Sequence, residues 1–207
     1  MTPDHRTAVM GILNITPDSF SDGGRFDSSE TAFRAAKRMA AQGADLIDLG
    51  AQSTRPGASD VGAEIELERL LPVLRRLQQA RDDGDLPAGV LFSIDTFLAP
   101  VAEACLDAGA DWINDVSGGL GDPQMWQLVA KRGCTYVLMH RRGDARTMNS
   151  LAHYSDVVAE VEAELLQLCE QAQQAGVQRQ QIVLDPCLLY TSPSPRDATL
   201  SRMPSSA

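Results

Sequence analysis

The sequence predicts an α/β fold in which a parallel sheet is assembled from repeated βα units. Short apolar segments, each ending in a polar residue, alternate along the chain with longer segments of helical periodicity. A weak internal repeat supports this pattern, because Gly43-Ala44-Asp45 and Gly109-Ala110-Asp111 each introduce an apolar segment at a corner between helix and strand. Regular alternation of this kind is typical of a parallel sheet whose strands are connected by helices.

The expected elements follow in chain order. Strands are predicted at Ala8–Asn14, Leu46–Leu49, Val90–Asp95, Trp112–Asp115, Thr135–His140 and Ile182–Asp185. The first helix is expected to begin with Asp27 as its N-cap and Glu30 at the third position, and to stop at Gly43. Later helices are predicted at Ile65–Leu77, Leu98–Leu106, Pro123–Lys131 and Val157–Gln174. Pro72 has no backbone N–H, so we expect it to kink or divide the second helix.

Six βα units without a Gly-x-Gly-x-x-Gly fingerprint favour a TIM (β/α)8 barrel over a dinucleotide-binding sheet. The pattern alone does not exclude a doubly wound sheet. A complete barrel has eight strands, so we expect residues 1–186 to form a partial barrel domain with about six of the eight units. The missing strands are expected to leave an exposed sheet edge that favours aggregation.

The sequence changes character at Cys187, and residues 187–207 show neither helical nor strand periodicity. Cys187 to Asp197 resembles the translation of the transposon end sequence that a common sequencing-library kit attaches to DNA. Ser201 to Ala207 resembles the translation of the next adapter stretch. We therefore expect residues 187–207 to be a non-native, disordered tail that takes no part in the fold.

Composition and charge exclude several classes of function. Of the 207 residues, 43% are hydrophobic and 22% are charged, which is typical of one soluble globular domain. The formal net charge of −10 opposes binding to nucleic acid. No apolar run is long enough to span a bilayer and Met1 to Met10 is no signal peptide, so we expect a cytoplasmic protein without a membrane partner.

The four cysteines are widely spaced, which argues against a zinc site and against a disulfide framework. We expect all of them to be buried free thiols. They are Cys105, Cys134, Cys169 and Cys187.

Polar residues dominate the ends of the predicted strands, where a barrel places its active site. The residues at these ends are Asn14, Asp48, Asp95, Asn114, Asp115, Met139, His140 and Asp185. Asp95, Asn114 and Asp185 together suit a flat, nitrogen-rich heterocycle, because carboxylates accept hydrogen bonds from ring N–H and amino groups. Each of the three, taken alone, could instead cap a strand or a neighbouring helix. His140 could be an acid-base group, although one histidine at a strand end is more often a structural partner.

Two loops carry further candidate binding residues. In the loop Asn14–Gly24, Asn14 and Asp22 suit a hard cation such as Mg²⁺, although such a stretch is often only a turn. In the loop Gln52–Gly57, Arg55 lies beside hydroxyl groups and could clamp a phosphate, or could be an ordinary surface arginine. No nucleophile is paired with a base in the sequence. This favours chemistry by positioning and charge stabilisation over covalent catalysis.

These loops resemble those of a known family. Gly11 to Gly24 (GILNITPDSFSDGG) and Ser53 to Gly57 (STRPG) closely resemble the two signature loops of the bacterial dihydropteroate synthase family. Later family blocks are matched in order by Ser93-Ile94-Asp95-Thr96, Ile113-Asn114-Asp115, Leu138-Met139-His140 and Leu184-Asp185-Pro186. The resemblance, which runs from Val9 to Pro186, implies a TIM barrel. It also implies an enzyme of folate synthesis, a sulfonamide target, that joins 4-aminobenzoate to the diphosphate ester of 6-hydroxymethyl-7,8-dihydropterin and releases diphosphate.

The resemblance also implies what individual residues do. The pterin pocket would be lined by Asp95, Asn114, Met139 and Asp185, with Thr54 nearby. The 4-aminobenzoate pocket would be formed by Phe20 and Pro56. Asn14 would bind Mg²⁺, and Asn14 and Arg55 would bind the diphosphate. The catalytic residues would be Asp22, Arg55 and Asp95, with Asp22 stabilising the pterin methylene cation. The partners would be these small molecules, and the full-length protein would be a homodimer.

Several positions depart from the family pattern. Gln52 stands where the family usually has glutamate and Ala145 where proline is common, and we expect both to be tolerated. Cys187 replaces the glycine that begins a Gly-rich segment. The family places a lysine that contacts both substrates and a closing Arg-x-His beyond this point, and the sequence contains neither there. We therefore expect this polypeptide to be inactive on its own.

Two other functions share the predicted pocket. A methyltetrahydrofolate-dependent methyltransferase is another pterin-binding barrel, but it has no use for loops that hold a diphosphate, so the two signature loops count against it. A non-catalytic pterin-binding protein would keep the pocket and lack the lysine or the Arg-x-His. A turnover assay on the restored full-length protein would distinguish the last alternative from an enzyme.

Overall fold

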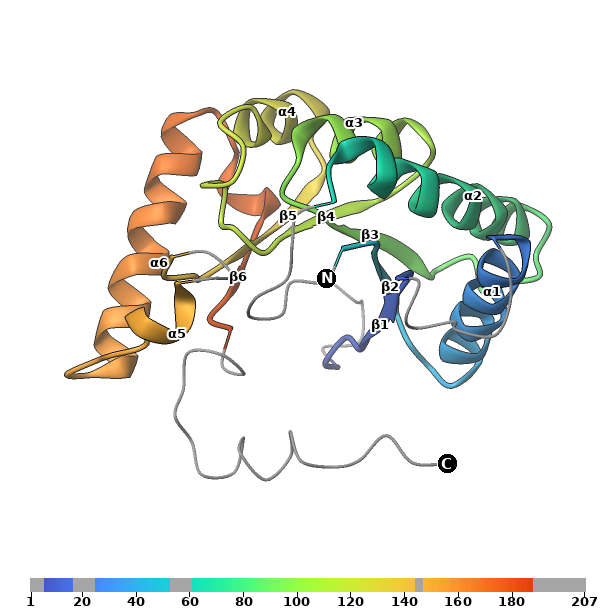
Figure 1. Ribbon diagram of the computed structural model, residues 1–207, viewed down its shortest axis with the longest axis horizontal. Helices are drawn as coiled ribbons and strands as arrows, with labels where there is room; N and C mark the ends of the chain where they lie inside the picture. The colour runs from blue at the N-terminus through green and yellow to red at the C-terminus, as the bar shows by residue number, and fades with distance from the viewer. Residues whose placement is uncertain (1–5, 17–24, 53–60, 144–146, 188–207) are drawn as a thin grey trace.

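A computed structural model of the chain describes residues 6–16, 25–52, 61–143 and 147–187 (Figure 1). Within these ranges six strands form one sheet: β1 (Met10–Asn14), β2 (Leu46–Gly50), β3 (Leu91–Asp95), β4 (Trp112–Asp115), β5 (Thr135–Met139) and β6 (Ile182–Asp185). The strands pair in chain order, and each neighbouring pair is parallel. The predicted α/β fold built from repeated βα units is confirmed.

Helices connect the strands and lie outside them. They are α1 (Arg25–Ala41), α2 (Ala63–Asp82), α3 (Ala99–Asp107), α4 (Met125–Arg132), α5 (Met148–Leu151) and α6 (Val157–Gln174), with a 3-10 turn η2 (Arg179–Gln181) before β6. Figure 1 shows α1, α2, α3, α4 and α6 arranged as an arc around the strands, which is the arrangement of a barrel wall. In the described part of the chain β1 and β6 are the two edges of the sheet, so the barrel is partial, as predicted.

The predicted start of the first helix is wrong, and Pro72 does not divide the second helix. The first helix begins at Arg25, so Asp27 lies inside it and is not its N-cap. The second helix continues through Pro72 from Ala63 to Asp82, longer than expected at both ends. Its buried face contains Leu70, Val73, Leu74 and Leu77 on both sides of the proline. Packing of this face against the sheet offsets the backbone hydrogen bond that proline cannot make.

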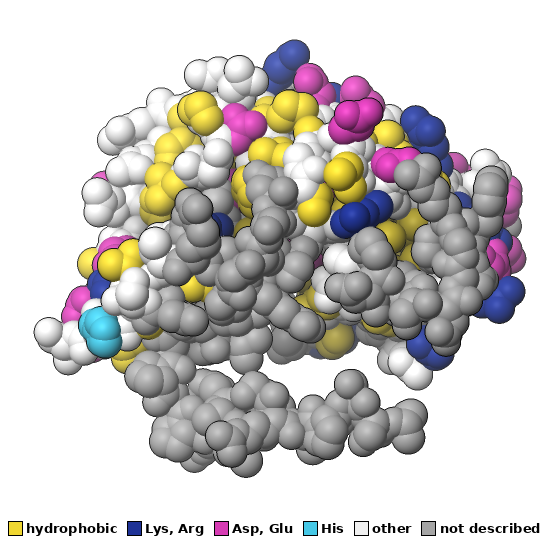
Figure 2. Space-filling view, viewed as in Figure 1, with side chains coloured by type: hydrophobic (Ala, Val, Ile, Leu, Met, Phe, Trp, Pro, Cys, Tyr) yellow, Lys and Arg dark blue, Asp and Glu magenta, His cyan; other side chains and the backbone are white. Residues whose placement is uncertain are grey.

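One face of the sheet packs against the helices and forms the core. Residues of β2 and β3 that contribute to this core are Ile47, Leu49, Phe92 and Ile94, all fully buried. Because side chains alternate along a strand, the residues between them point to the opposite face. On the side of the molecule seen in Figure 2, charged side chains of both signs gather along the outer rim, over the helices.

The four cysteines are free, as predicted, but only Cys105 and Cys187 are buried, whereas Cys134 and Cys169 are partly exposed. Burial raises the pKa of the Cys105 thiol to about 12.

None of the helices in the described ranges is long and apolar enough to cross a membrane. Residues 188–207, which make up nearly all of the predicted tail, lie outside the described residues.

Cys187 adopts a backbone conformation that favours glycine. Its φ is 51°, and among the described residues it is the only non-glycine with a positive φ. In this left-handed region the Cβ atom of an L-residue crowds the backbone carbonyl oxygen, at a cost of roughly 1 kcal/mol. The conformation agrees with the resemblance, which places a glycine here.

We expect Cys187→Gly to raise the free energy of unfolding by about 1 kcal/mol, because glycine has no Cβ atom that could crowd the backbone carbonyl oxygen. Urea denaturation of the 207-residue chain measures this change. Cys187→Ala is the matched control, since it removes the thiol and keeps the Cβ. Equal effects of the two substitutions would show that the thiol, and not backbone strain, decides the stability at this position.

Candidate functional site

The sheet register brings predicted site residues together on one face. Asn14, Gly50, Asp95 and Asn114 form a row across β1, β2, β3 and β4. Side chains in register on parallel strands point to the same face. In the next row towards the carboxyl ends, Met139 of β5 pairs with Asp185 of β6, and both share this face by alternation. The strands therefore present Asn14, Asp95, Asn114, Met139 and Asp185 opposite the helix-covered core.

Gly50 leaves room for the polar groups on either side of it. A Cβ at this position would lie 3.1 Å from Asp95 Oδ2 and 3.4 Å from Asn14 Oδ1. The carboxylate and the amide therefore approach each other over β2, where a larger side chain would separate them. We did not identify Gly50 from the sequence, because a glycine after an apolar segment is typical of a simple turn. Its place between two strands that end in polar residues is the signal that could have identified it.

Three acceptor oxygens of the site are buried and, within the described ranges, have no hydrogen-bond partner. They are Oδ1 of Asp48, Oδ1 of Asp95 and Oδ1 of Asn114. Leaving a buried acceptor unpaired costs about 1–3 kcal/mol, and such groups are rare in native proteins unless a ligand or water completes them. The arrangement therefore suits a ligand that donates several hydrogen bonds.

Asp95 lies at the centre of this group. Burial raises the pKa of its carboxyl group well above the usual range, and the neighbouring carboxylates of Asp48, Glu66 and Asp115 raise it further. Burial also raises the pKa of Asp48, although Ser93 and Asn114 beside it oppose that shift. Strongly perturbed carboxyl groups that gather in one place are typical of functional sites.

Glu66 is a buried residue near the site that we did not predict. Its side chain is 1% exposed, and its Oε2 accepts a hydrogen bond of 2.8 Å from the Thr96 hydroxyl group. Thr96 directly follows Asp95, so this bond joins α2 to the end of β3. Polar residues in a helix usually form its solvated face. Only the position of Glu66 four residues before the buried Leu70 could have indicated that it faces the sheet.

The expectation that Asp115 faces the site is wrong. Its carboxylate accepts hydrogen bonds from the Ser117 N–H (2.8 Å) and hydroxyl group (2.6 Å), the Gly119 N–H (3.0 Å) and the Tyr136 hydroxyl group (2.8 Å). Asp115 lies next to Asn114 in the sequence, so alternation turns it towards the core. Its four hydrogen bonds hold the loop after β4 against β5.

His140 also faces the helices and not the site. Its side chain is 1% exposed, and its Nε2 lies 2.6 Å from Glu164 Oε2 on α6. Its backbone N–H donates to the Asp185 carbonyl oxygen at 2.7 Å. His140 thus joins β5, β6 and α6, so it is a structural partner and not an acid-base group of the site.

Asp185 is half-buried, and its Oδ1 accepts a hydrogen bond from the Cys187 N–H at 2.8 Å.

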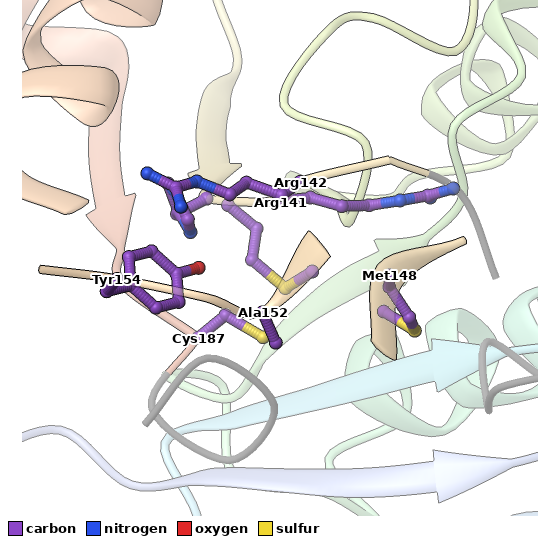
Figure 3. Close-up of a pocket in the computed structure, with 8 residues that line it drawn as sticks. Arg141, Arg142, Met148, Ala152, Tyr154 and Cys187 are labelled. Atoms are coloured by element: carbon purple, nitrogen blue, oxygen red, sulfur yellow. The ribbon is translucent and has the colours of Figure 1, made fainter. Parts of the chain in front are cut away.

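A pocket borders Met139 at the end of β5 (Figure 3). Its lining residues are Met139, His140, Arg141, Arg142, Met148, Ala152, Tyr154 and Cys187. Arg142 lies 3.9 Å from the centre of the Tyr154 ring and forms ion pairs with Glu160 at 2.7 Å and with Glu164. The hydrogen bond from Arg142 lowers the pKa of Glu160 to about 2. Arg142 is therefore held in the wall of the pocket, and Figure 3 shows Arg141 extending away from it in the opposite direction.

Five predicted site residues lie outside the described part of the chain. Phe20 and Asp22 belong to residues 17–24, and Thr54, Arg55 and Pro56 belong to residues 53–60. These two segments follow β1 and β2, whose carboxyl ends carry Asn14 and Gly50. Within the described ranges no three His, Cys, Asp or Glu side chains are grouped so that they could hold a metal ion. The Asn14 amide oxygen is nevertheless a suitable ligand for Mg²⁺, which keeps several waters and needs few protein ligands.

Comparison with known proteins identifies relatives over most of the chain. The family model described as pterin binding enzyme matches residues 10–202. Dihydropteroate synthase from Synechocystis sp. is 43% identical over 197 residues, which cover 95% of this chain and 66% of that protein. The chain thus spans just under two thirds of the length of this curated relative.

Two solved structures of dihydropteroate synthase from Xanthomonas albilineans resemble the structure of this chain. The structure with 4-aminobenzoic acid has a TM-score of 0.81 and 39% identity, and the alignment covers 97% of this chain and 67% of the other. The structure in complex with 7,8-dihydropteroate has a TM-score of 0.76 and 36% identity, with coverage of 96% and 66%. The fold of the described strands and helices is therefore that of a TIM-barrel enzyme.

Proposed function

Because this chain belongs to the pterin-binding enzyme family, we propose that the protein condenses 4-aminobenzoate with the diphosphate ester of 6-hydroxymethyl-7,8-dihydropterin in folate synthesis. The observation that carries the proposal is the pair of buried acceptor oxygens, Oδ1 of Asp95 and Oδ1 of Asn114, that have no hydrogen-bond partner among the described residues. A pterin ring presents N–H and amino groups that would satisfy such acceptors. The two similar synthases, solved with 4-aminobenzoic acid and with 7,8-dihydropteroate, support this choice of substrates.

We assign the pterin ring to the face that carries Asp95, Asn114, Met139 and Asp185, with Thr54 nearby. The carboxylates and the Asn114 amide oxygen accept hydrogen bonds from the edge of the ring, and Met139 packs against it. The 4-aminobenzoate would bind between Phe20 and Pro56. The family resemblance supports these last two positions and Thr54, which the structure does not describe.

The chemistry is a substitution at the pterin methylene carbon. The amino nitrogen of 4-aminobenzoate forms the new C–N bond, the C–O bond to diphosphate breaks, and diphosphate leaves with the electron pair while the amine loses a proton to solvent. Arg55 would bind the departing diphosphate, and the carboxylate of Asp22 would stabilise positive charge on the carbon. Asn14 would hold Mg²⁺, which when bound neutralises charge on the diphosphate.

Three further assignments complete the proposal. The partners are small molecules, and the full-length protein is proposed to be a homodimer on the basis of the family resemblance. The cytoplasm is the proposed location, which the four free thiols support because a reducing compartment keeps cysteines unpaired. Residues 187–207 are proposed to be non-native, with the glycine-like backbone at Cys187 in support.

A chimera tests the proposed activity. Residues 1–186 are joined to the remaining third of the Synechocystis relative, and diphosphate release is measured with both substrates present. We expect release that depends on 4-aminobenzoate. The 207-residue chain alone is expected to bind the pterin without turnover, because the resemblance assigns essential contacts to a lysine and an Arg-x-His beyond position 186.

The chimera carrying Asp95→Ala is the matched control and should release no diphosphate. A chimera that binds the pterin but never releases diphosphate would favour the alternative of a non-catalytic pterin-binding protein. A chimera that binds no pterin would contradict the proposed substrate class as a whole.

A further inference from the structure

Asp48 is a buried carboxylate on the site face for which no motif assigned a function. It lies one row below the site residues, in register with Ile12 of β1 and Ser93 of β3, and its side chain is 3% exposed. Its Oδ2 accepts a hydrogen bond of 3.0 Å from Asn114 Nδ2. Asp48 and Asn114 are on β2 and β4, so this contact spans β3. The small side chain of Ser93 lies on β3 between the two.

This contact determines which end of the Asn114 amide faces a ligand. An amide has a donor end and an acceptor end, whereas an ionised carboxylate only accepts hydrogen bonds. Asp48 therefore holds the NH₂ end of Asn114. The other end, Oδ1, is buried and has no hydrogen-bond partner in the part of the chain that the structure describes. The same holds for Oδ1 of Asp95, its neighbour in register.

We propose that Asp48 is a positioning residue that fixes the Asn114 amide with its oxygen towards the ligand. Asp95 and Asn114 then form a continuous row of acceptors, and the site selects the edge of a heterocycle that presents hydrogen-bond donors. The identity of that heterocycle as a pterin rests on the proposed function. The orientation of Asn114 does not, because it follows from the contacts of the free protein.

An amide at position 48 no longer fixes this arrangement. In Asp48→Asn the new side chain can accept from Asn114 Nδ2 through its oxygen, or donate to Asn114 Oδ1 through its NH₂ group. In the second case the Asn114 amide turns, so that its NH₂ group and a ligand N–H face each other and neither has an acceptor. We expect the dissociation constant for 6-hydroxymethyl-7,8-dihydropterin, measured by calorimetry on the 207-residue chain, to rise roughly two- to tenfold.

The double variant Asp48→Asn with Asn114→Asp provides the rescue. The amide at position 48 donates to the carboxylate at position 114, whose second oxygen again faces the ligand as an acceptor. We expect this variant to recover most of the affinity that Asp48→Asn loses. Asp82→Asn, on the exposed end of α2, makes the same change of charge and is expected to leave the affinity unchanged. Failure of the double variant to recover affinity would overturn the proposal and leave Asp48 with a purely structural function.

A measurement without ligand separates this inference from the proposed function. The side-chain NH₂ protons of Asn114 are observed by ¹⁵N NMR, and their exchange with water is timed. We expect slow exchange in the unmodified chain, because Asp48 holds these protons, and faster exchange in Asp48→Asn. Equal exchange in the two proteins would overturn the proposal. If the unmodified chain binds no pterin, the proposed function fails, and the exchange rates still decide the orientation of Asn114.

Should Asp48→Asn fail to fold, Asp48→Ala is measured in its place. This variant leaves no partner for the Asn114 NH₂ group. We expect weaker pterin binding and faster exchange of the Asn114 side-chain protons. Unchanged affinity together with unchanged exchange would overturn the proposal.

Discussion

Asp95→Ala is expected to weaken the binding of 6-hydroxymethyl-7,8-dihydropterin by about 100-fold or more, which is about 3 kcal/mol of binding free energy. The Asp95 carboxyl group is buried, and its Oδ1 has no hydrogen-bond partner among the described residues. A ligand N–H that donates to this buried oxygen forms a hydrogen bond that no described group of the free protein makes. The substitution leaves that N–H buried and unpaired. Titration calorimetry on the 207-residue chain measures the change.

Asp82→Ala is the matched control for this experiment, because it removes one carboxylate from the exposed end of α2, far from the site face. We expect it to leave the affinity unchanged. If Asp95→Ala and Asp82→Ala bind the pterin equally well, the pterin does not bind against β3, and the assignment of this face as the pterin pocket is wrong.

The second large effect concerns stability. Asp115→Ala is expected to lower the free energy of unfolding by about 4 kcal/mol, because the Asp115 carboxylate accepts four hydrogen bonds in a site closed to water. The substitution leaves the Tyr136 hydroxyl group and the Ser117 and Gly119 N–H groups without their acceptor. Burial and the neighbouring Asp115 raise the pKa of Tyr136, so its hydroxyl group stays protonated and donates. Urea denaturation of the 207-residue chain measures the loss.

Tyr136→Phe is a control with a smaller expected effect, since it removes one of the four donors to Asp115 and keeps the aromatic ring. We expect it to cost about 1 kcal/mol. A loss below about 1 kcal/mol in Asp115→Ala would show that water replaces the carboxylate, and that the loop after β4 does not depend on it.

The strands were predictable because of what a barrel requires of them. Each strand packs an apolar face on the helices and presents polar groups where it ends, so the end of an apolar segment marks both the strand and its contribution to the site. The sequence alone therefore predicted that Asn14, Asp95, Asn114 and Asp185 lie at or near the ends of strands, as the structure confirms. The helix starting at Asp27 was misplaced because Asp-x-x-Glu is a capping pattern that also occurs inside a helix. Helix α5, with four residues, is too short to show a period.

What the sequence did not determine was which face each residue at a strand end occupies. Asn114 and Asp115 are adjacent, and Asn114 lies on the site face while Asp115 lies on the core face. A shift of one residue reverses this choice, so only the register with the neighbouring strands decides it. Gly50 and Glu66 depend on contacts between separate elements. The residue pattern within a single helix or strand does not show these contacts.

The strand order described above also bears on how the chain acquires its structure during synthesis. Every strand is hydrogen-bonded to the strand that immediately precedes it in the sequence, from β1 through β6. A nascent polypeptide can therefore add each βα unit to the units already formed as it leaves the ribosome, without waiting for a distant segment. We expect the Asp95 and Asn114 acceptors to be in place once β4 has joined the sheet, before the later units are made.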